Sequence, residues 1–216
     1  MRKKSTVLVA LAASFFASAS TAQNSAPAQP PTSTPLTSQE REAAIKQFET
    51  TRDNFLKSIS GLSEKQWTFK PAPDRWSVAE VAEHITVSES TLGGLVQQKI
   101  MQSPATPQKR DQVKGKDEMI LQRVPDRSHK AQAPEFLRPT GRWATKADLT
   151  KAFEDARASN MNYIRTTNDD LRDHFFDHPV FGTLDGYQWL LLISTHSLRH
   201  TEQIEEVKAD PNFPKE

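Results

Sequence analysis

Apolar side chains recur at intervals of mostly three and four residues over the segment 37–60. Its apolar positions are Ile45, Phe48, Phe55, Leu56 and Ile59. Such intervals keep side chains on one face of an α-helix. The segment opens with Thr37-Ser-Gln-Glu40, a capping-box pattern in which a Thr is followed three residues later by a Glu. Gly61 supplies an end, so the pattern predicts a helix over about 37–60.

A second helix is predicted from Ser77 to about Met101. Ser77-Val-Ala-Glu80 forms another capping box. The inward positions that follow are Val81, His84, Ile85, Ser88, Leu92 and Leu95. The pair Gly93-Gly94 is expected to weaken the later turns, because glycine loses more backbone freedom in a helix than other residues do.

A third helix is predicted over 145–168 and a fourth over 185–208. The third begins at Thr145-Lys-Ala-Asp148, and its inward side carries Leu149, Phe153, Ala156, Asn160 and Tyr163. The fourth begins near Asp185 and is ended by Pro211, which cannot continue a helix. Its inward face carries Trp189, Ile193, His196, His200 and Val207.

Four amphipathic helices without a convincing alternating strand indicate an all-α fold, a four-helix bundle. The connection between the second and third helices, 102–144, is long for a bundle and contains five prolines, so we expect it to cross the bundle. Within this crossover, 116–124 could form a short helix. One domain is therefore expected over 37–208, followed by a C-terminal tail over 209–216.

The N-terminus has the pattern of a secretory signal peptide over 1–22. Three basic residues precede an apolar run from Val7 to Ala17, and small residues follow it up to Ala22. We therefore expect an exported protein, periplasmic or secreted. The apolar run is shorter than the roughly 20 residues of a membrane span, so no span is expected. Residues 23–36 are rich in Pro, Ala and Ser, and we expect them to form a disordered leader.

The charge balance gives no indication of a nucleic-acid partner. Without the three basic residues of the signal segment, 25 Lys and Arg face 27 Asp and Glu, and no basic stripe is present. The chain contains no cysteine, which excludes disulfides and thiolate ligands. Any metal ion must therefore be held by His, Asp or Glu.

Three histidines lie on inward helix faces. His196 and His200 are four residues apart, so both imidazoles can reach one ion, and His84 lies on or beside the inward stripe of the second helix. A buried neutral imidazole that binds no metal needs a hydrogen-bond acceptor for its N–H and a hydrogen-bond donor for its other nitrogen. The pattern favours a metal site formed by these three residues, with half-buried, hydrogen-bonded rings as the open alternative. Imidazole suits zinc, nickel, copper and iron.

Other polar and aromatic residues are weaker candidates. His178, in the loop before the fourth helix, could belong to a pocket. Asn160 and Tyr163 could line the same pocket, or form a polar patch inside the bundle. Glu80 shares a face with His84, but its place in the capping box explains it. The residues expected to serve in packing are Trp67, Trp76 and Trp189.

Two segments resemble the DinB superfamily of four-helix metal-binding proteins. In GLSEKQWTFKPAPDRWSVAEVAEHITVSES, Trp76-Ser77 leads into the helix that carries His84. The segment HPVFGTLDGYQWLLLISTHSLRHTEQI holds an H-x-x-x-H pair followed by Gln203. The similarity covers about 37–208. It implies a DinB-like bundle with one divalent ion, most often nickel or zinc, held by one histidine of the second helix and two of the fourth. By position these ligands are His84, His196 and His200.

The resemblance also implies a class of chemistry. Characterised superfamily members include thiol-dependent S-transferases and isomerases, so the implied function is a metal that activates a small thiol, or water for hydrolysis, on a small-molecule substrate. A metalloprotease is excluded because Ser197 stands where H-E-x-x-H has its glutamate. A di-iron site is excluded because it needs Glu-x-x-His on two helices. The alternative is a non-catalytic metal-binding or stress-related interaction bundle. Many such bundles pair, so a homodimer is a further expectation.

Overall fold

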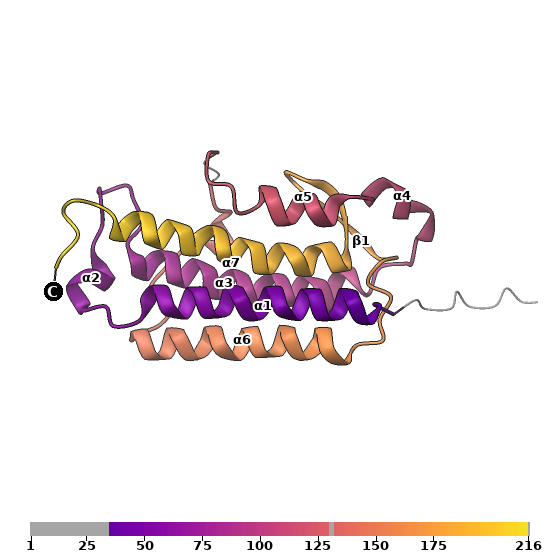
Figure 1. Ribbon diagram of the computed structural model, residues 1–216, viewed down its shortest axis with the longest axis horizontal. Helices are drawn as coiled ribbons and strands as arrows, with labels where there is room; N and C mark the ends of the chain where they lie inside the picture. Colours follow the sequence, from indigo (N-terminus) through magenta and orange to yellow (C-terminus); the bar gives the residue numbers. More distant parts are fainter. Residues whose placement is uncertain (1–34, 130–131, 216) are drawn as a thin grey trace, which may run out of the picture. The chain divides into compact units, whose positions relative to one another are not determined.

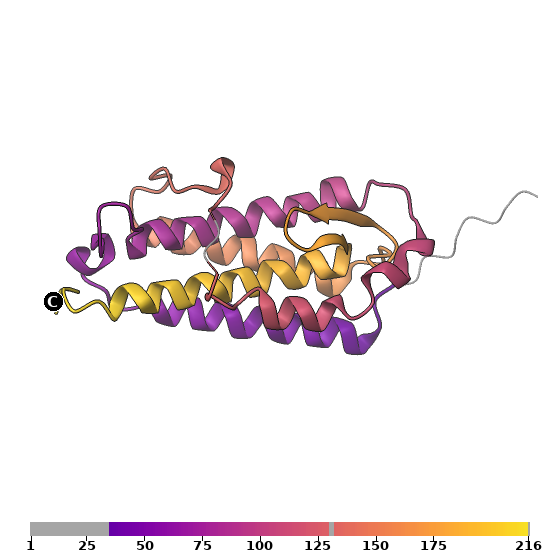
Figure 2. The same ribbon diagram turned by 90° about the horizontal axis from the view of Figure 1, so that it is seen from above.

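The computed structural model describes residues 35–129 and 132–215. Its four long helices are α1 (Ser38–Ile59), α3 (Val78–Leu95), α6 (Lys146–Thr166) and α7 (Gly186–Lys208). They run side by side, with α1 and α3 each packed against both α6 and α7 (Figures 1 and 2). The predicted all-α four-helix bundle is therefore confirmed. The predicted signal peptide, residues 1–22, and nearly all of the predicted leader lie outside the described residues.

Shorter elements connect the long helices. They are α2 (Glu64–Thr68), a π-helical turn (Val96–Ile100), η2 (Pro107–Lys109), α4 (Arg110–Val113), α5 (Lys116–Arg123), η3 (Glu135–Leu137), β1 (Phe175–His178) and β2 (Gly182–Asp185). The helix predicted inside the crossover is α5, which packs against α7 (Figure 1). No helix in the described part of the chain is long and apolar enough to cross a membrane.

The predicted helix starts are present. Thr37, Ser77 and Asp185 each cap a helix and accept a hydrogen bond from the backbone N–H three residues on, and each forms a complete capping box. Thr145 caps α6 by accepting from the N–H of Asp148 at 3.1 Å. These side chains satisfy N–H groups that a helix cannot satisfy internally.

The β-hairpin was not predicted from the sequence. Its strands pair antiparallel with Phe175 opposite Asp185 and His178 opposite Gly182. Each strand is only four residues long, which is too short for apolar alternation to reveal. The hairpin packs against the first turn of α7, where Trp189 Nε1 donates to the Phe176 carbonyl at 3.0 Å.

Gly93 in α3 has a packing role. A Cβ added at Gly93 would lie 2.1 Å from Asn160 Oδ1, so glycine at this position leaves room for the buried amide of Asn160. The helix continues to Leu95 and then into the π-helical turn.

The core begins at the last residue of the expected leader and extends through the bundle. Leu36 is only 6% exposed and packs with the apolar residues of one half of the bundle. A second apolar cluster, containing Phe55, Trp67 and Phe153, occupies the other half. The packing expected for Trp67 and Trp189 is present, since both are buried.

A fully buried ion pair lies between the helices. Arg157 of α6 makes two hydrogen bonds of 2.8 Å to the carboxylate of Glu89 on α3, and both side chains are 0% exposed. Arg157 also donates to the Phe48 carbonyl and Thr51 Oγ1 of α1, at 2.6 and 2.7 Å. A further bond of 2.9 Å reaches Ser197 Oγ on α7. One guanidinium thus links all four helices.

This arrangement generates a stability prediction. Arg157→Met keeps much of the side-chain volume but leaves Glu89 buried without its cation. We expect the free energy of unfolding to fall by about 3–5 kcal/mol, the usual effect of breaking a buried pair from one side. Urea denaturation followed by circular dichroism measures it. As a control, Lys151→Met removes a surface pair with Asp155 and should leave stability nearly unchanged. Similar losses in both variants would contradict the prediction.

Candidate metal centre

The three histidines singled out in the sequence meet at the contact between α3 and α7. His84 Nε2 lies 3.3 Å from His196 Nε2 and 3.2 Å from His200 Nε2. Each residue offers one nitrogen, and the three nitrogens lie within 4.8 Å of one another. The four-residue spacing on α7 places its two rings on one face, opposite the single ring of α3.

Hydrogen bonds at the far side of two rings determine which nitrogens carry protons. His84 Nδ1 lies 2.8 Å from the Leu137 carbonyl, and His200 Nδ1 lies 2.8 Å from Gln203 Oε1. Both partners are oxygens that only accept, so each Nδ1 carries the hydrogen. The Nε2 atoms of neutral His84 and His200 therefore each carry a lone pair, and the two atoms face each other.

This donor set fits a metal ion. Two facing lone pairs 3.2 Å apart repel each other unless a proton or a cation lies between them. Zn–N bonds of about 2.0–2.1 Å around one ion require N···N separations of roughly 3.0–3.4 Å, which matches the observed distances. Hydrogen bonds that fix the tautomer of ligating histidines are usual in metal sites.

Burial keeps the rings in the form that binds metals. It lowers the pKa of His84, an effect that the bond to Leu137 partly opposes. Burial also lowers the pKa of His196 and His200 well below the usual value, and the neighbouring histidines add to this. All three are therefore neutral at neutral pH, as metal ligation requires.

The site is protein-lined on one side and partly open on the other. His84 is 1% exposed, whereas His196 and His200 are half-buried. Trp76 packs its ring on His84, with 5.1 Å between centroids. Within the described part of the chain, no further His, Asp or Glu joins the group. The protein side of the site thus consists of three nitrogens.

The weaker candidates lie elsewhere. His178, on β1, stacks on Phe181 and packs against Trp189, and its Nδ1 accepts hydrogen bonds from the N–H groups of Val180 and Phe181. It therefore faces the part of α7 two turns before His196 and lies outside the group of three.

Asn160 and Tyr163 were expected to line a pocket or form a polar patch. Asn160 is buried and donates to both the backbone carbonyl and the carboxylate of Glu89, which places it in the polar interior. Tyr163 donates to Asp169 at 2.7 Å near the end of α6. Glu80 caps α3, as expected, and also pairs with Lys70.

Sequence reasoning did not identify two partners of the site. The Leu137 carbonyl belongs to the backbone, so no residue type signals it. Arg127 donates to Gln203 Oε1 at 3.4 Å and forms two bonds with Glu206, at 2.6 and 2.7 Å. Arg127 lies in the crossover, and the sequence does not show that the crossover passes beside α7. Gln203 itself carried a usable signal, because it follows His200 by three residues on the same helix.

The fold and this histidine group define a class, the four-helix bundles with a potential three-histidine metal site. A sequence model of the DinB superfamily matches residues 47–204, and the chain belongs to that superfamily. Among curated proteins it is similar to the uncharacterized protein YuaE of Bacillus subtilis (strain 168). The two are 25% identical over 150 residues, which cover 69% of this chain and 88% of YuaE.

Solved structures with a similar fold are also known. TT2238, described as a four-helix bundle protein, has a TM-score of 0.50 and 16% identity, over 77% of this chain and 98% of its own. YfiT from Bacillus subtilis, described as a probable metal-dependent hydrolase with an unusual four-helix bundle topology, has a TM-score of 0.48 and 13% identity. That match covers 83% of this chain and 91% of YfiT. The likeness to TT2238 agrees with the bundle fold.

The lowered histidine pKa values generate a prediction for the metal-free protein. In the unfolded chain a histidine pKa is near 6.5, whereas the pKa values of His84, His196 and His200 are lower when the chain is folded. Below about pH 6.5 the unfolded state therefore binds more protons, and stability falls as the pH falls. Urea titrations between about pH 7.5 and 5.5 should show this slope. His200→Ala should reduce this dependence of stability on pH, whereas His129→Ala, at an exposed position, should leave it unchanged. Equal slopes in the two variants would contradict the role given to His200.

Proposed function

We propose that this protein binds one divalent metal ion through the Nε2 atoms of His84, His196 and His200. The observation that carries the proposal is the convergence of three imidazole nitrogens, of which those of His84 and His200 face each other with a lone pair each. Membership of the DinB superfamily supports it. Nickel and zinc are the first candidates, and imidazole ligands also suit iron and copper.

The surrounding residues would prepare this site in defined ways. Leu137 and Gln203 accept from the Nδ1–H groups of His84 and His200 and hold both rings in the ligating tautomer. The tilted ring of Trp76 packs against the His84 ring, with 5.1 Å between their centroids. Three protein ligands with room for an exchangeable one is the pattern of catalytic sites, whereas structural sites are closed by a fourth protein ligand.

The activity that this arrangement supports best is metal-dependent hydrolysis, or small-thiol-dependent transfer, on a small-molecule substrate. A bound metal would supply a Lewis acid and lower the pKa of water or a thiol in the exchangeable position. We further propose that residues 1–22 export the protein. Export would separate it from cytoplasmic thiols, and this favours water as the activated group. The second candidate is a bundle that binds metal without turnover.

Metal content tests the site directly. After loading with nickel or zinc and dialysis, we expect about one ion per chain in the wild type, measured by elemental analysis. His84→Ala, His196→Ala and His200→Ala should each lose most of it, because two imidazoles hold an ion far less tightly than three. His129→Ala removes an exposed histidine and should retain the metal. A wild-type protein that stays metal-free after loading with both metals would exclude the site.

An exchangeable position separates the enzyme from the non-catalytic bundle. Cobalt(II) can replace zinc as a spectroscopic probe, and 2-mercaptoethanol can serve as an added ligand. An open site should show a new thiolate-to-cobalt absorption band, together with metal-dependent hydrolysis of p-nitrophenyl acetate that His200→Ala abolishes. A cobalt spectrum that the thiol leaves unchanged, with no metal-dependent turnover, would favour the non-catalytic alternative.

A further inference from the structure

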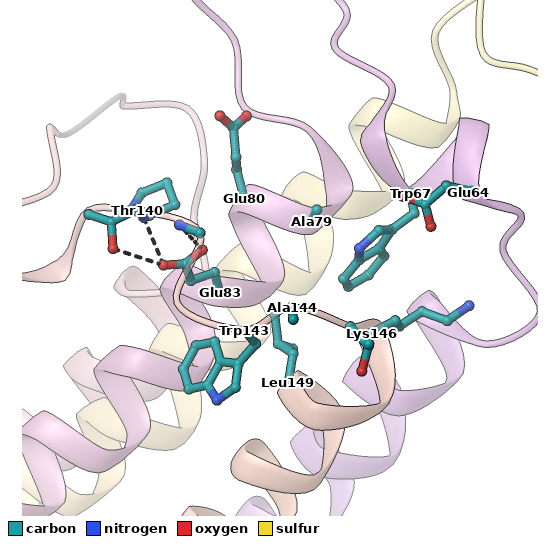
Figure 3. A pocket seen from close by; sticks show the side chains of 13 residues that line it. Glu64, Trp67, Ala79, Glu80, Glu83, Thr140, Trp143, Ala144, Lys146 and Leu149 are labelled. Carbon is teal, nitrogen blue, oxygen red and sulfur yellow. Dashed lines mark hydrogen bonds between the residues drawn. The ribbon is translucent and has the colours of Figure 1, made fainter.

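Glu83, the residue before His84, is a buried carboxylate that the proposed metal chemistry does not use. It is 5% exposed and points from α3 toward the crossover (Figure 3). Its oxygens accept hydrogen bonds from three consecutive backbone N–H groups. The donors are Thr140 at 2.7 Å, Gly141 at 2.9 Å and Arg142 at 3.3 Å.

The backbone at Gly141 makes this convergence of donors feasible. Its φ is +76°, in the left-handed region that favours glycine. Successive N–H groups that turn inward in this way form a concave site for an anion. Here the anion is the carboxylate of Glu83, so charge and geometry on both sides are matched.

The same segment supplies the acceptor for His84. The Leu137 carbonyl, three residues before Thr140, lies 2.8 Å from His84 Nδ1. Arg142 braces the two parts of the segment, since it donates to the Phe136 carbonyl at 3.3 Å. Two neighbouring residues of α3 therefore hold one short piece of the crossover.

Glu83 and His84 make the polar contacts between α3 and this part of the crossover. Within the described residues, every hydrogen bond and ion pair between the segment 132–145 and α3 goes to Glu83 or His84. A cavity of about 530 Å³ lies between the first turns of α3 and the segment 139–146 (Figure 3). Apolar packing holds the two ends of the segment, since Leu137 is buried and Trp143 packs against the apolar cluster of the bundle. Between them, beside the cavity, the bonds to Glu83 fix the turn over residues 140–142.

We propose that Glu83 is a positioning residue for His84. By holding residues 140–142, it places the Leu137 carbonyl where His84 Nδ1–H can donate to it. The hydrogen stays on Nδ1, and the Nε2 lone pair faces His196 and His200. Its effect on metal binding rests on the proposed function, but its effect on the His84 tautomer is a property of the metal-free protein.

The tautomer can be measured without any metal. In the metal-free wild type, ¹⁵N NMR of the imidazole nitrogens should show His84 protonated on Nδ1. Glu83→Gln, which replaces one accepting oxygen with a donor, should introduce a substantial Nε2–H population, and Glu83→Ala a larger one. Glu80→Gln is the matched control, because Glu80 lies one turn earlier on α3 and glutamine is also accepted in a capping box. It should keep the wild-type tautomer.

A second pair of variants tests the crossover side and does not touch Glu83. Gly141→Ala strains the turn that carries the three donors, whereas Gly61→Ala applies a similar strain at the end of α1. The two glycines have φ values of +76° and +70°, and a Cβ would meet nothing within 4 Å at either. Of the two, only Gly141→Ala should shift the His84 tautomer. Because this variant leaves Glu83 in place, it tests the proposal even if Glu83→Ala does not fold.

Metal affinity provides the second measurement. With nickel or zinc, we expect Glu83→Ala to bind about 10–100-fold more weakly than the wild type, the usual effect of losing an outer partner of a ligand. A wild-type His84 tautomer in folded Glu83→Gln and Gly141→Ala variants would overturn the proposal. A tautomer shift in a protein whose wild type binds neither metal would uphold the role of Glu83 and overturn the metal function instead.

Discussion

Arg157 and Glu89 form the interaction on which the bundle depends. A guanidinium and a carboxylate without solvent exposure are tolerable only while every strong donor and acceptor is paired. Here the partners come from all four helices, so rotating or sliding one helix would leave a buried charge without its bond. The pair therefore specifies the register of the helices more strictly than their apolar faces can, because apolar faces tolerate small shifts.

The histidine group inherits its geometry from this pair. Ser197 lies between His196 and His200 on α7, and its hydroxyl accepts from Arg157 at 2.9 Å. With that turn of α7 oriented toward the interior, the two rings beside it project toward α3. The two polar centres then differ in one respect. The ion pair is satisfied by protein groups alone, whereas the Nε2 atoms of His84 and His200 face each other, each with a lone pair.

The sequence predicted the four helices, their starts and the three histidines that meet, because periodicity and capping are local properties. It did not predict the hairpin, whose four-residue strands are too short for a pattern. The acceptor at Leu137 could not be predicted either, since a backbone carbonyl has no residue type. Ser197 illustrates a partial success. Its identity excluded protease chemistry, but its bond to Arg157 depends on the packing of α6. Asn160 was likewise visible as a polar residue on an inward face, and only the fold shows that it serves Glu89.

The use of a main-chain carbonyl at residue 137 has an evolutionary consequence. Any amino acid presents the same oxygen, so the acceptor itself would survive substitution of the leucine side chain. An insertion or deletion between residues 137 and 142 would instead separate the carbonyl from the turn anchored by Glu83. Selection on this part of the crossover should therefore act on its length and on the glycine that shapes the turn, while many of its exposed side chains are free to diverge.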